Sequence, residues 1–449
     1  MLKPGQLVTV SVHSLTDKGD GIATLEGRPL YIEGILPGER AEVRLTLVKP
    51  NYCHGQAVQL LQAAAARCQD FCPYTACGGC QLRVMSNSAQ LELKRQLLLE
   101  ALQAQGLDCP VAQTLGMDEP YHYRNKAQYA VQPGPYIGFY AKHSHQLVEV
   151  DECRVQAPET TEVVRLIRSW MRQCAVPAYN EALHVGCVRH IMVRNGVNSG
   201  EVMVVLVVAE MPAEAALEQL VAQLGPVPGL ASLILNLNTA TGNRVLGPDN
   251  RLLWGKDSID DSLDGLAFSI SPLSFYQVNP RQTEVLYREA LRQASLQGHE
   301  VVFDLYCGIG TIALFMSRKA HRVIGIELVP EAIADARANA ALNAISNVEF
   351  HQGAAELRVP ELYAEGVRAD VVVVDPPRKG CDPALLETLA RMRPERLVYV
   401  SCNPKTLARD LAWLTDHGFV LEQATPVDMF PHTMHVETVA LLTRRADEK

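Results

Sequence analysis

The first part of the chain alternates short apolar runs with turns that contain glycine. The apolar runs predict strands at 7–12, 29–32, 42–48 and 55–61, and the glycine turns fall at 17–23 and 36–39. Short strands separated by regular turns are typical of small barrels of the OB kind, which often serve as platforms for nucleic acids. We therefore predict an OB-like β-barrel over residues 1–61.

The middle of the chain mixes helical and extended patterns. Residues 88–102 carry apolar side chains three and four positions apart, which predicts an amphipathic helix. An apolar run at 201–208 predicts a strand, and residues 212–224 predict another helix. This combination predicts an α+β central domain over residues 62–272.

From residue 273 onward the pattern becomes regular. Apolar strands are expected at 301–305, 322–326, 348–351, 369–374 and 397–400, and alanine-rich helical stretches separate them. Such alternation predicts a parallel sheet with helices on both faces. We therefore expect this multidomain chain to end in a Rossmann-like α/β domain at 273–449.

Length and composition agree with a multidomain cytoplasmic protein. A chain of 449 residues exceeds what one core usually holds. It contains no run of about 18 apolar residues, and no apolar segment follows the first charged residue as it would in a signal peptide. In the cytoplasm the 12 cysteines are expected as thiols, metal ligands or catalysts rather than as disulfides.

The overall charge argues against a surface that binds nucleic acids everywhere. The formal net charge is −9, whereas nonspecific nucleic-acid binders usually carry a basic surface. A local basic patch facing RNA is compatible with this balance, and so is an ordinary solvated surface. The candidates for such a patch are His122, Arg124, Lys126, Lys142, His143 and His145.

A glycine-containing turn follows the strand expected at 301–305. The segment Asp304-Leu-Tyr-Cys-Gly-Ile-Gly-Thr311 opens a helix, and its glycines let a ligand approach the backbone closely. The next strand ends in Glu327, whose carboxylate suits the two hydroxyl groups of a ribose. Two glycines preceded by an acid do not form the dinucleotide fingerprint. They resemble the first two motifs of S-adenosylmethionine-dependent methyltransferases; an ordinary turn beside a solvated glutamate is the alternative.

Two later strands end in groups that can act on a nucleobase. Asp375-Pro-Pro-Arg378 forms a rigid loop of the kind that holds a planar base in amino-methyltransferases. Cys402 follows the strand at 397–400, where it is placed to act as a nucleophile. Carbon 5 of a pyrimidine becomes nucleophilic only after a thiolate has added to carbon 6. A base must then remove the carbon 5 proton, and Glu437 offers a carboxylate.

With these residues the chain resembles the RNA uracil-C5 methyltransferase family over nearly its whole length. The matching motifs, in family order, are Ser274-Phe-Tyr-Gln277-Val-Asn279, Asp304-Leu-Tyr306-Cys-Gly-Ile-Gly310, Glu327, Asp375-Pro-Pro-Arg378, Ser401-Cys-Asn-Pro404 and His435-Val-Glu437-Thr-Val439. The resemblance implies that S-adenosylmethionine is bound by Gln277, Tyr306, Thr311, Glu327 and Asp375. It implies Cys402 as the nucleophile and Glu437 as the base, and it implies that the N-terminal barrel is a TRAM domain that binds RNA.

A second group of cysteines has the spacing of a metal site. Cys77-Gly-Gly-Cys80 lies five residues after Cys72, and no second Cys-x-x-Cys pair is present to complete a zinc site. Three clustered cysteines and a distant one suit a [4Fe–4S] cluster, and the family resemblance implies Cys153 as the distant ligand. Cys68 is the alternative to Cys72 as the first ligand. A reduced loop that holds no metal is the other interpretation.

These observations predict a monomeric, S-adenosylmethionine-dependent enzyme that makes 5-methyluridine in RNA. The family arrangement implies 23S ribosomal RNA as the substrate. Methylation of a tRNA uridine is an alternative within the same class. A non-catalytic RNA-binding or assembly factor, and a nitrogen methyltransferase that does not need Cys402, are alternatives from other classes.

Overall fold

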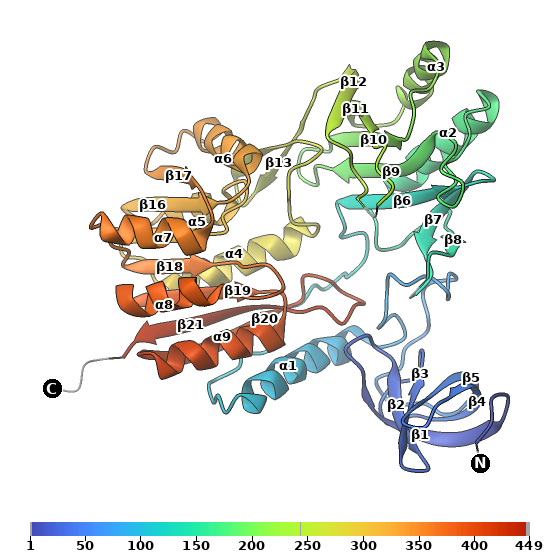
Figure 1. Ribbon diagram of the computed structural model, residues 1–449, viewed down its shortest axis with the longest axis horizontal. Coiled ribbons are helices and arrows are strands. Elements are labelled where there is room, and N and C mark those ends of the chain that lie inside the picture. Colours follow the sequence, from blue (N-terminus) through green and yellow to red (C-terminus); the bar gives the residue numbers. More distant parts are fainter. Residues whose placement is uncertain (1, 143, 243, 446–449) are drawn as a thin grey trace.

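The computed structural model describes residues 2–142, 144–242 and 244–445. Figure 1 shows three parts, which are a small N-terminal barrel, a central sheet and a larger layered unit at the C-terminus. The barrel and the central sheet lie on one side of the molecule and the C-terminal unit on the other. Connecting segments cross between them.

The N-terminal part is a closed barrel of five strands in the order β1-β2-β3-β5-β4. Its strands are β1 (Leu7–Leu15), β2 (Gly21–Leu25), β3 (Arg28–Ile32), β4 (Arg40–Val48) and β5 (Cys53–Gln62). Alternate side chains point inward, so that Leu30, Ile32 and Val43 are fully buried. The barrel expected from the glycine turns is thereby confirmed.

The central part is a seven-stranded sheet in the order β12-β11-β10-β9-β6-β7-β8. Its elements are β6 (Lys126–Gln132), β7 (Tyr136–Tyr140), β8 (Leu147–Glu149), α2 (Glu159–Gln173), β9 (Val188–Asn195), β10 (Val202–Val208), α3 (Glu214–Leu224), β11 (Leu230–Leu237) and β12 (Asp249–Gly255). Helices α2 and α3 cover one face, where Trp170 and Leu217 are buried. Met203 and Val205, on the opposite face, belong to the core of the C-terminal unit.

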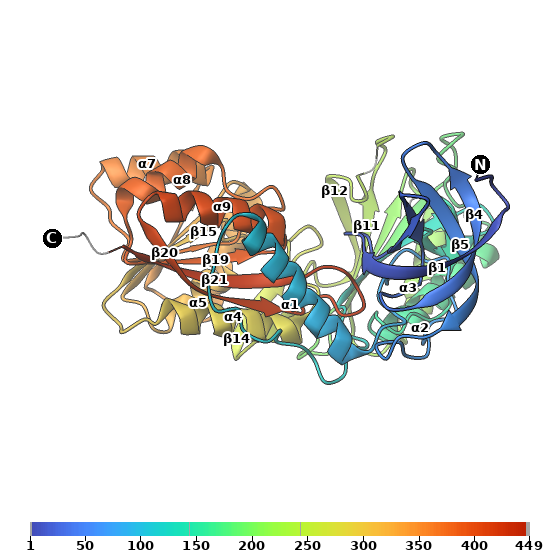
Figure 2. The same ribbon diagram turned by 90° about the horizontal axis from the view of Figure 1, so that it is seen from below.

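The C-terminal unit is built on a second seven-stranded sheet in the order β17-β16-β15-β18-β19-β21-β20. Its strands are β15 (Val301–Leu305), β16 (Arg322–Glu327), β17 (Val348–Gln352), β18 (Val371–Val374), β19 (Arg396–Ser401), β20 (Phe419–Val427) and β21 (Glu437–Arg444), and the hairpin β13 (Ile259–Leu263) and β14 (Leu266–Ile270) precedes them. Its helices are α4 (Pro280–Ala294), α5 (Thr311–Ser317), α6 (Pro330–Leu342), α7 (Ala355–Ala364), α8 (Pro383–Met392) and α9 (Pro404–Asp416). In Figure 2, α7, α8 and α9 lie on one side of this sheet, and α4 and α5 lie on the other.

The sheet is not parallel throughout, which differs from the expectation. Strands β15 to β19 run parallel, but β21 pairs antiparallel with both β19 and β20. Parallel neighbours need a crossover connection of a dozen or more residues, usually a helix. The chain has only residues 428–436 between β20 and β21, so the two strands form a hairpin. This hairpin places the start of β21 beside the end of β19.

Helix α1 (Asn87–Ala104) lies against the C-terminal sheet although it precedes the central sheet in sequence. Leu98 and Leu102 of α1 are buried in the core under α9 and β20. The chain then runs along β20, with bridges from Val111 to Ala424 and from Leu115 to Val427. Figure 2 shows α1 crossing near β20 and α9. None of the helices in the described ranges is long and apolar enough to cross a membrane.

Candidate active site

A cavity of about 640 Å³ opens at the carboxyl ends of β15, β16 and β18. Such ends are where open α/β sheets bind ligands. The residues predicted to bind the cofactor that line this cavity are Gln277, Tyr306, Glu327 and Asp375. Cys402 and Glu437 line the same cavity. Sequence segments up to 160 residues apart therefore converge on one space.

The turn after β15 has the backbone geometry that close approach of a ligand requires. Gly308 has a φ of 54°, and a Cβ added there would meet no atom within 4 Å, so its open side faces the cavity. Gly310 has a φ of 84°, and an added Cβ would come within 2.8 Å of Phe350. Tyr306 also has a positive φ, 66°, which is costly for a residue with a side chain.

Glu327 holds this turn through its carboxylate. Its Oε2 accepts a hydrogen bond from the backbone N–H of Gly308 at 3.2 Å, and its Oε1 accepts one from Val329 at 2.9 Å. The carboxylate therefore stands at the rim of the cavity in a defined orientation. This is the position from which an acid can bind the hydroxyl groups of a ribose.

The sheet register brings Cys402 and Glu437 together. In the antiparallel ladder of β19 and β21, Ser401 pairs with Thr438. Cys402 follows Ser401 and Glu437 precedes Thr438, so the two residues lie opposite each other at the next position beyond this pair. Asp375 follows the neighbouring strand β18, and its backbone N–H donates to the carbonyl of Leu305. The nucleophile and base candidates thus lie side by side, with the Asp375 loop adjoining them.

The electrostatics of this group favour the protonated forms. Burial and the neighbouring Asp375 raise the pKa of the Glu437 carboxyl to about 8. Burial raises the pKa of Asp375 to about 7. Burial, Glu437 and Asp375 together raise the pKa of the Cys402 thiol to about 11, against a smaller opposing effect of Arg378. A positive charge entering the cavity would lower all three pKa values.

Helix α9 fixes the loop that carries Cys402. Asn403 caps this helix by accepting a hydrogen bond from the backbone N–H of Lys405 at 3.1 Å. The Asn403 amide and the Thr406 hydroxyl both donate to the carbonyl of Arg378, at 3.2 and 3.1 Å. The Cys402 loop and the Asp375-Pro-Pro-Arg378 loop are therefore joined directly.

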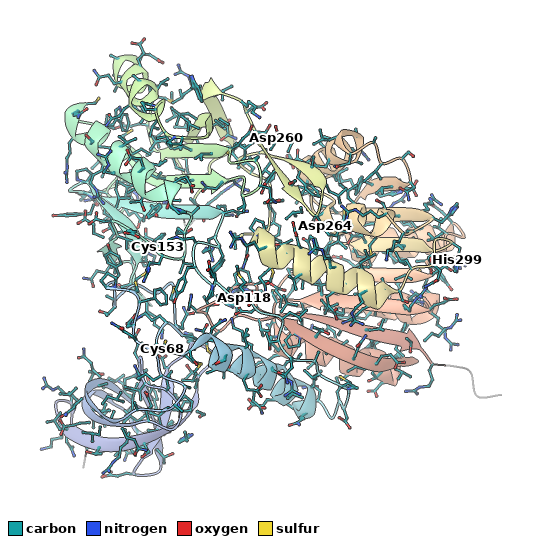
Figure 3. The ribbon with its side chains drawn as sticks, turned by 180° about the vertical axis from the view of Figure 1, so that it is seen from behind. Cys68, Asp118, Cys153, Asp260, Asp264 and His299 are labelled. Carbon is teal, nitrogen blue, oxygen red and sulfur yellow. The ribbon has the colours of Figure 1, made fainter. Side chains whose placement is uncertain are left out.

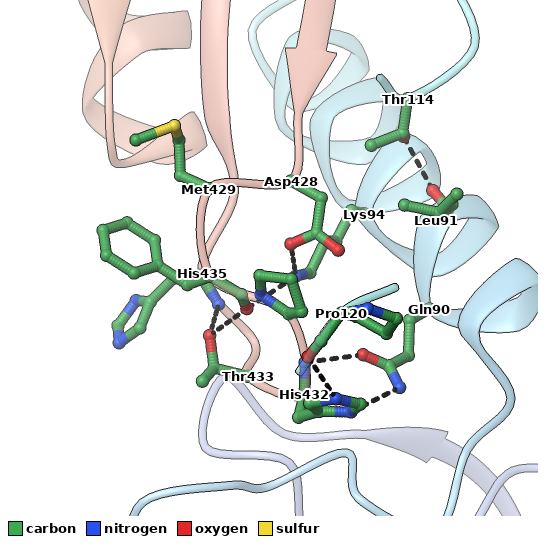
Figure 4. Close-up of polar contacts among 12 residues, drawn as sticks. Gln90, Leu91, Lys94, Thr114, Pro120, Asp428, Met429, His432, Thr433 and His435 are labelled. Atoms are coloured by element: carbon green, nitrogen blue, oxygen red, sulfur yellow. Dashed lines mark hydrogen bonds and ion pairs between the residues drawn. The ribbon is translucent and has the colours of Figure 1, made fainter. Parts of the chain in front are cut away.

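The loop between β20 and β21 carries two further residues into the cavity. Phe430 and His435 both line it, and their rings meet edge to face at 5.9 Å between centroids. Figure 4 shows the loop held by Gln90 and Lys94 of α1, with His432 hydrogen bonded to Gln90 and to the carbonyl of Pro120. Sequence reasoning assigned no role to Phe430 or His435. Only the position of His435 beside Glu437 in the quoted motif could have indicated it.

A second cavity, of about 670 Å³, contains the cysteine group. Cys72, Cys77, Cys80 and Cys153 all line it. Cys68 does not, and its thiol instead lies 3.8 Å from the carbonyl oxygen of Arg83. Figure 3 labels Cys68 beside the end of the barrel and Cys153 beside the central sheet. His435 lines both this cavity and the cofactor cavity, so the two spaces adjoin.

The cysteine side chains are not drawn together as the ligands of one ion would be. Across residues 2–142, 144–242 and 244–445, no three His, Cys, Asp or Glu side chains converge tightly enough to hold a metal ion. Burial is the largest effect on Cys80 and raises the pKa of its thiol to about 12. The four thiols therefore surround one cavity without converging on a single point.

Two predicted positions lie elsewhere. Thr311 begins α5, and its hydroxyl is 3.0 Å from that of Tyr287; it is not among the residues that line the cofactor cavity. His143 lies outside the described residues. The assigned roles of all the site residues, and the domain boundaries at 61 and 272, stay predictions.

A sheet with helices on both faces, a glycine turn, an acid at the end of the second strand and a cavity at its carboxyl edge place the C-terminal unit in the nucleotide-binding α/β class. The family model for tRNA (uracil-5-)-methyltransferases matches residues 249–445, and the model for the TRAM domain matches residues 2–58. Among known proteins, an uncharacterized RNA methyltransferase of Halalkalibacterium halodurans is 45% identical over 97% of this chain and 96% of its own length. An uncharacterized RNA methyltransferase of Clostridium tetani is 43% identical over 100% of this chain and 98% of its own length.

A solved structure resembles the whole chain. It is the Pyrococcus abyssi tRNA (uracil-54, C5)-methyltransferase in complex with S-adenosyl-L-homocysteine, with a TM-score of 0.78, 28% identity, and coverage of 97% of this chain and 100% of that one. The chain belongs to the S-adenosylmethionine-dependent RNA uracil-C5 methyltransferase family that carries an N-terminal TRAM domain. The family resemblance, the TRAM barrel and the methyltransferase fold are thereby confirmed.

Proposed function

We propose that this protein methylates carbon 5 of a uridine in 23S ribosomal RNA through a covalent bond between Cys402 and carbon 6 of the base. The observation that carries the proposal is the placement of Cys402 and Glu437 opposite each other, directly beyond the Ser401–Thr438 pair of the β19–β21 ladder, where both line the cavity that Glu327 and Asp375 also line. A thiol and a carboxyl on one wall are the two groups that this chemistry needs.

The proposed reaction begins with attack by Cys402 on the base and ends with its release. Bound S-adenosylmethionine supplies an electrophilic methyl group on a positively charged sulfur. The Cys402 thiolate adds to carbon 6, and the π electrons of the carbon 5–carbon 6 bond move toward the carbonyl oxygen at carbon 4. The returning electron pair would form the bond from carbon 5 to the methyl group while the methyl–sulfur bond breaks, its electron pair leaving on neutral S-adenosylhomocysteine. Glu437 then accepts the proton of carbon 5. The electron pair left behind re-forms the double bond and expels the Cys402 thiolate.

The raised pKa values of Glu437 and Cys402 fit an enzyme whose catalytic groups become ionised when the positively charged cofactor binds. The Glu437 carboxyl must be ionised to accept a proton, and the Cys402 thiol must be ionised to attack. A sulfonium beside Asp375 and Glu437 would favour their ionised forms. The site would therefore be assembled electrostatically as well as sterically.

The catalytic roles are tested by two substitutions. We expect Cys402→Ala to abolish methyl transfer and to leave S-adenosylhomocysteine binding within about twofold, since the thiol is not needed to hold the cofactor. We expect Glu437→Gln to accumulate a protein–RNA adduct that survives denaturing electrophoresis, because the carbon 5 proton stays in place. Cys109→Ala, remote from the cavity, is the matched control. Full turnover by Cys402→Ala would refute the mechanism, and so would adduct-free turnover by Glu437→Gln.

A tRNA substrate is the alternative, and two comparisons favour it, since the family model that matches residues 249–445 is that of tRNA (uracil-5-)-methyltransferases. The solved structure that resembles the whole chain is that of a tRNA (uracil-54, C5)-methyltransferase. Methyl transfer to separated rRNA and tRNA pools, taken from cells that lack the protein, distinguishes the two. Labelling confined to 23S rRNA supports the proposal, and labelling confined to tRNA replaces it. Labelling of neither pool favours a non-catalytic RNA-binding factor.

We further propose that Cys72, Cys77, Cys80 and Cys153 hold a [4Fe–4S] cluster. Four thiols around one cavity fit this group, because a four-iron cluster takes one thiolate on each iron and so needs four separated sulfurs. Its expected contribution is structural. It would tie the loop at 72–80 to the segment of Cys153, which the Tyr74 hydroxyl already contacts by accepting a hydrogen bond from Asp151. We also propose that the protein is cytoplasmic. We propose that it is a monomer, which size-exclusion chromatography with light scattering tests.

A further inference from the structure

Strand β6, together with Arg124 two residues before it, presents a polar row to the cysteine-lined cavity, here called the β6 row. Arg124, Lys126 and Gln128 are two residues apart, and all three line the cavity. The side chains of Ala127 and Tyr129, which point to the opposite face, are buried in the core of the central domain. The row is therefore a built part of the cavity wall and not a loose surface feature.

The wall of this cavity is strongly cationic although the chain as a whole is acidic. Among the described residues that line it, the basic ones are Lys18, Arg83, Arg124, Lys126, Lys142 and Arg154, and the one carboxylate is Asp17. Several of these charges are already neutralised inside the protein. Arg83 pairs with Asp70, Lys142 with Asp20, and Asp17 with Lys405. The charges of the β6 row are not.

Lys126 and Arg124 have no carboxylate partner. Among the described residues no acid lies within ion-pair distance of either side chain, and the Nε of Arg124 is buried without a hydrogen-bond partner. Lys126 instead pairs in the sheet with a third cation, Arg194, whose guanidinium donates to the carbonyl of Ser274. Burial, Arg194 and Arg124 lower the pKa of Lys126 to about 8. Three crowded cations without a counterion leave a place for an anion.

The position of the row connects it to the catalytic site. The backbone N–H of Asn125, between Arg124 and Lys126, donates to the carbonyl of Val278 at 2.9 Å. The Asn125 amide donates to the carbonyl of Gln277 at 3.1 Å. These two hydrogen bonds join the row to the segment at 277–278, which includes the predicted cofactor-binding residue Gln277. The cavity that the row lines adjoins the catalytic cavity at His435. An anion held on the row would belong to a ligand that reaches Cys402.

We propose that Arg124 and Lys126 bind a backbone phosphate of the RNA, next to the nucleotide that enters the catalytic cavity. This inference rests on the proposed function for the identity of the ligand as RNA. A phosphodiester shares one negative charge over two non-bridging oxygens, which can accept hydrogen bonds from two adjacent cations, and such contacts fix the register of a strand without reading its sequence. The substrate strand therefore runs along β6, past the cysteine loop, before the target base reaches Cys402.

The test measures binding and needs no catalysis, so that it can succeed or fail independently of the methylation mechanism. The affinity for fluorescein-labelled oligouridylate is measured by anisotropy over a range of salt concentrations. We expect Lys126→Gln to weaken binding about tenfold at low salt, and to reduce the slope of log K against log salt by about 0.7, the value of one contact to a single strand. Lys126→Arg should retain the slope. Lys319→Gln, on an exposed residue of the C-terminal unit, is the matched control.

The alternative role of the row is to balance the negative charge of an iron–sulfur cluster. In that case Lys126→Gln lowers the iron and sulfide content and leaves the salt slope unchanged, which would overturn the proposal. Lysine acylation of the wild-type protein, read by mass spectrometry, gives an answer even if the variants do not fold. RNA should protect Lys126 and leave Lys319 unprotected. Equal labelling of Lys126 with and without bound RNA would also overturn the proposal.

Discussion

Lys94 of α1 forms a fully buried ion pair with Asp428, the first residue of the loop that leads to Glu437. Both side chains are 0% exposed, and the Lys94 ammonium also donates to the carbonyl of Phe430 at 3.0 Å. Burial lowers the pKa of Lys94 and raises that of Asp428, while each partner opposes the shift of the other. A helix that precedes the central sheet in sequence therefore positions the loop at 428–436, as Figure 4 shows.

Breaking this pair should destabilise the protein strongly. Lys94→Met leaves the Asp428 carboxylate buried and unpaired, which is expected to lower the free energy of unfolding by about 3–5 kcal/mol. The double variant Lys94→Met, Asp428→Asn should recover part of this loss, because no uncompensated charge remains. Lys256→Met, which removes exposed pairs with Glu201 and Asp260, should change it by less than about 1 kcal/mol. Urea denaturation measures all three, and a Lys94→Met effect as small as that of the control would contradict the prediction.

Stability should depend on pH through Asp375 and Glu437. Their pKa values are raised, so the folded protein retains protons that the unfolded chain releases above pH 3.8 and 4.5. The stabilisation is complete below these values and is lost as the pH rises through about 7 and 8. Each group adds a slope of at most about 1.4 kcal/mol per pH unit.

Glu437→Gln removes the titration of residue 437. It also removes a neighbouring negative charge, which makes the raised pKa of Asp375 lower. The free energy of unfolding of the cofactor-free protein, measured between pH 5 and pH 8 (about the range of the two transitions), should therefore fall less steeply in this variant. Glu422→Gln, on the exposed side of β20, serves as the control with an unaltered slope. Parallel pH profiles for Glu437→Gln and the wild type would show that the carboxyl is ionised in the folded protein.

Glu327 should contribute to cofactor affinity through its charge. Glu327→Gln preserves the size of the side chain but replaces a charged acceptor with a neutral one. We expect S-adenosylhomocysteine to bind about 10-fold more weakly, since hydrogen bonds to charged groups contribute about 1.5–3 kcal/mol. Isothermal titration calorimetry measures this, with Glu349→Gln on the neighbouring strand as the control. An unchanged dissociation constant would remove Glu327 from the ribose site.

The two candidate first ligands of the cluster can be separated by substitution. Cys72→Ser should lower the iron and sulfide content of anaerobically purified protein. It should also lower the absorbance at about 400 nm, where iron–sulfur clusters absorb. Cys68→Ser should leave both unchanged, because its side chain does not line the cavity of the other cysteines. The reverse pattern would make Cys68 the ligand, and full iron content in both variants would argue against the cluster.

Local patterns were sufficient to predict the barrel, the C-terminal α/β unit and the motifs that carry the chemistry. Glycine turns, apolar strands and the cysteine and proline motifs are properties of neighbouring residues, so they can be read in order along the chain. The antiparallel end of the sheet was not foreseen. The length of the connection at 428–436 decides it, and that length was visible only once the strand ends were known.

The sequence by itself determined which chemical groups are available: a thiol at Cys402, carboxyls at Glu437 and Asp375, and a thiol group around Cys77 and Cys80. Only the tertiary structure decided which of them meet. The β19–β21 register sets Glu437 beside Cys402, the fold of the segment at 68–80 brings Cys72 and not Cys68 to the common cavity, and α1 reaches across to pair Lys94 with Asp428. These contacts join residues far apart in the chain, and they depend on burial and strand pairing that no local pattern specifies.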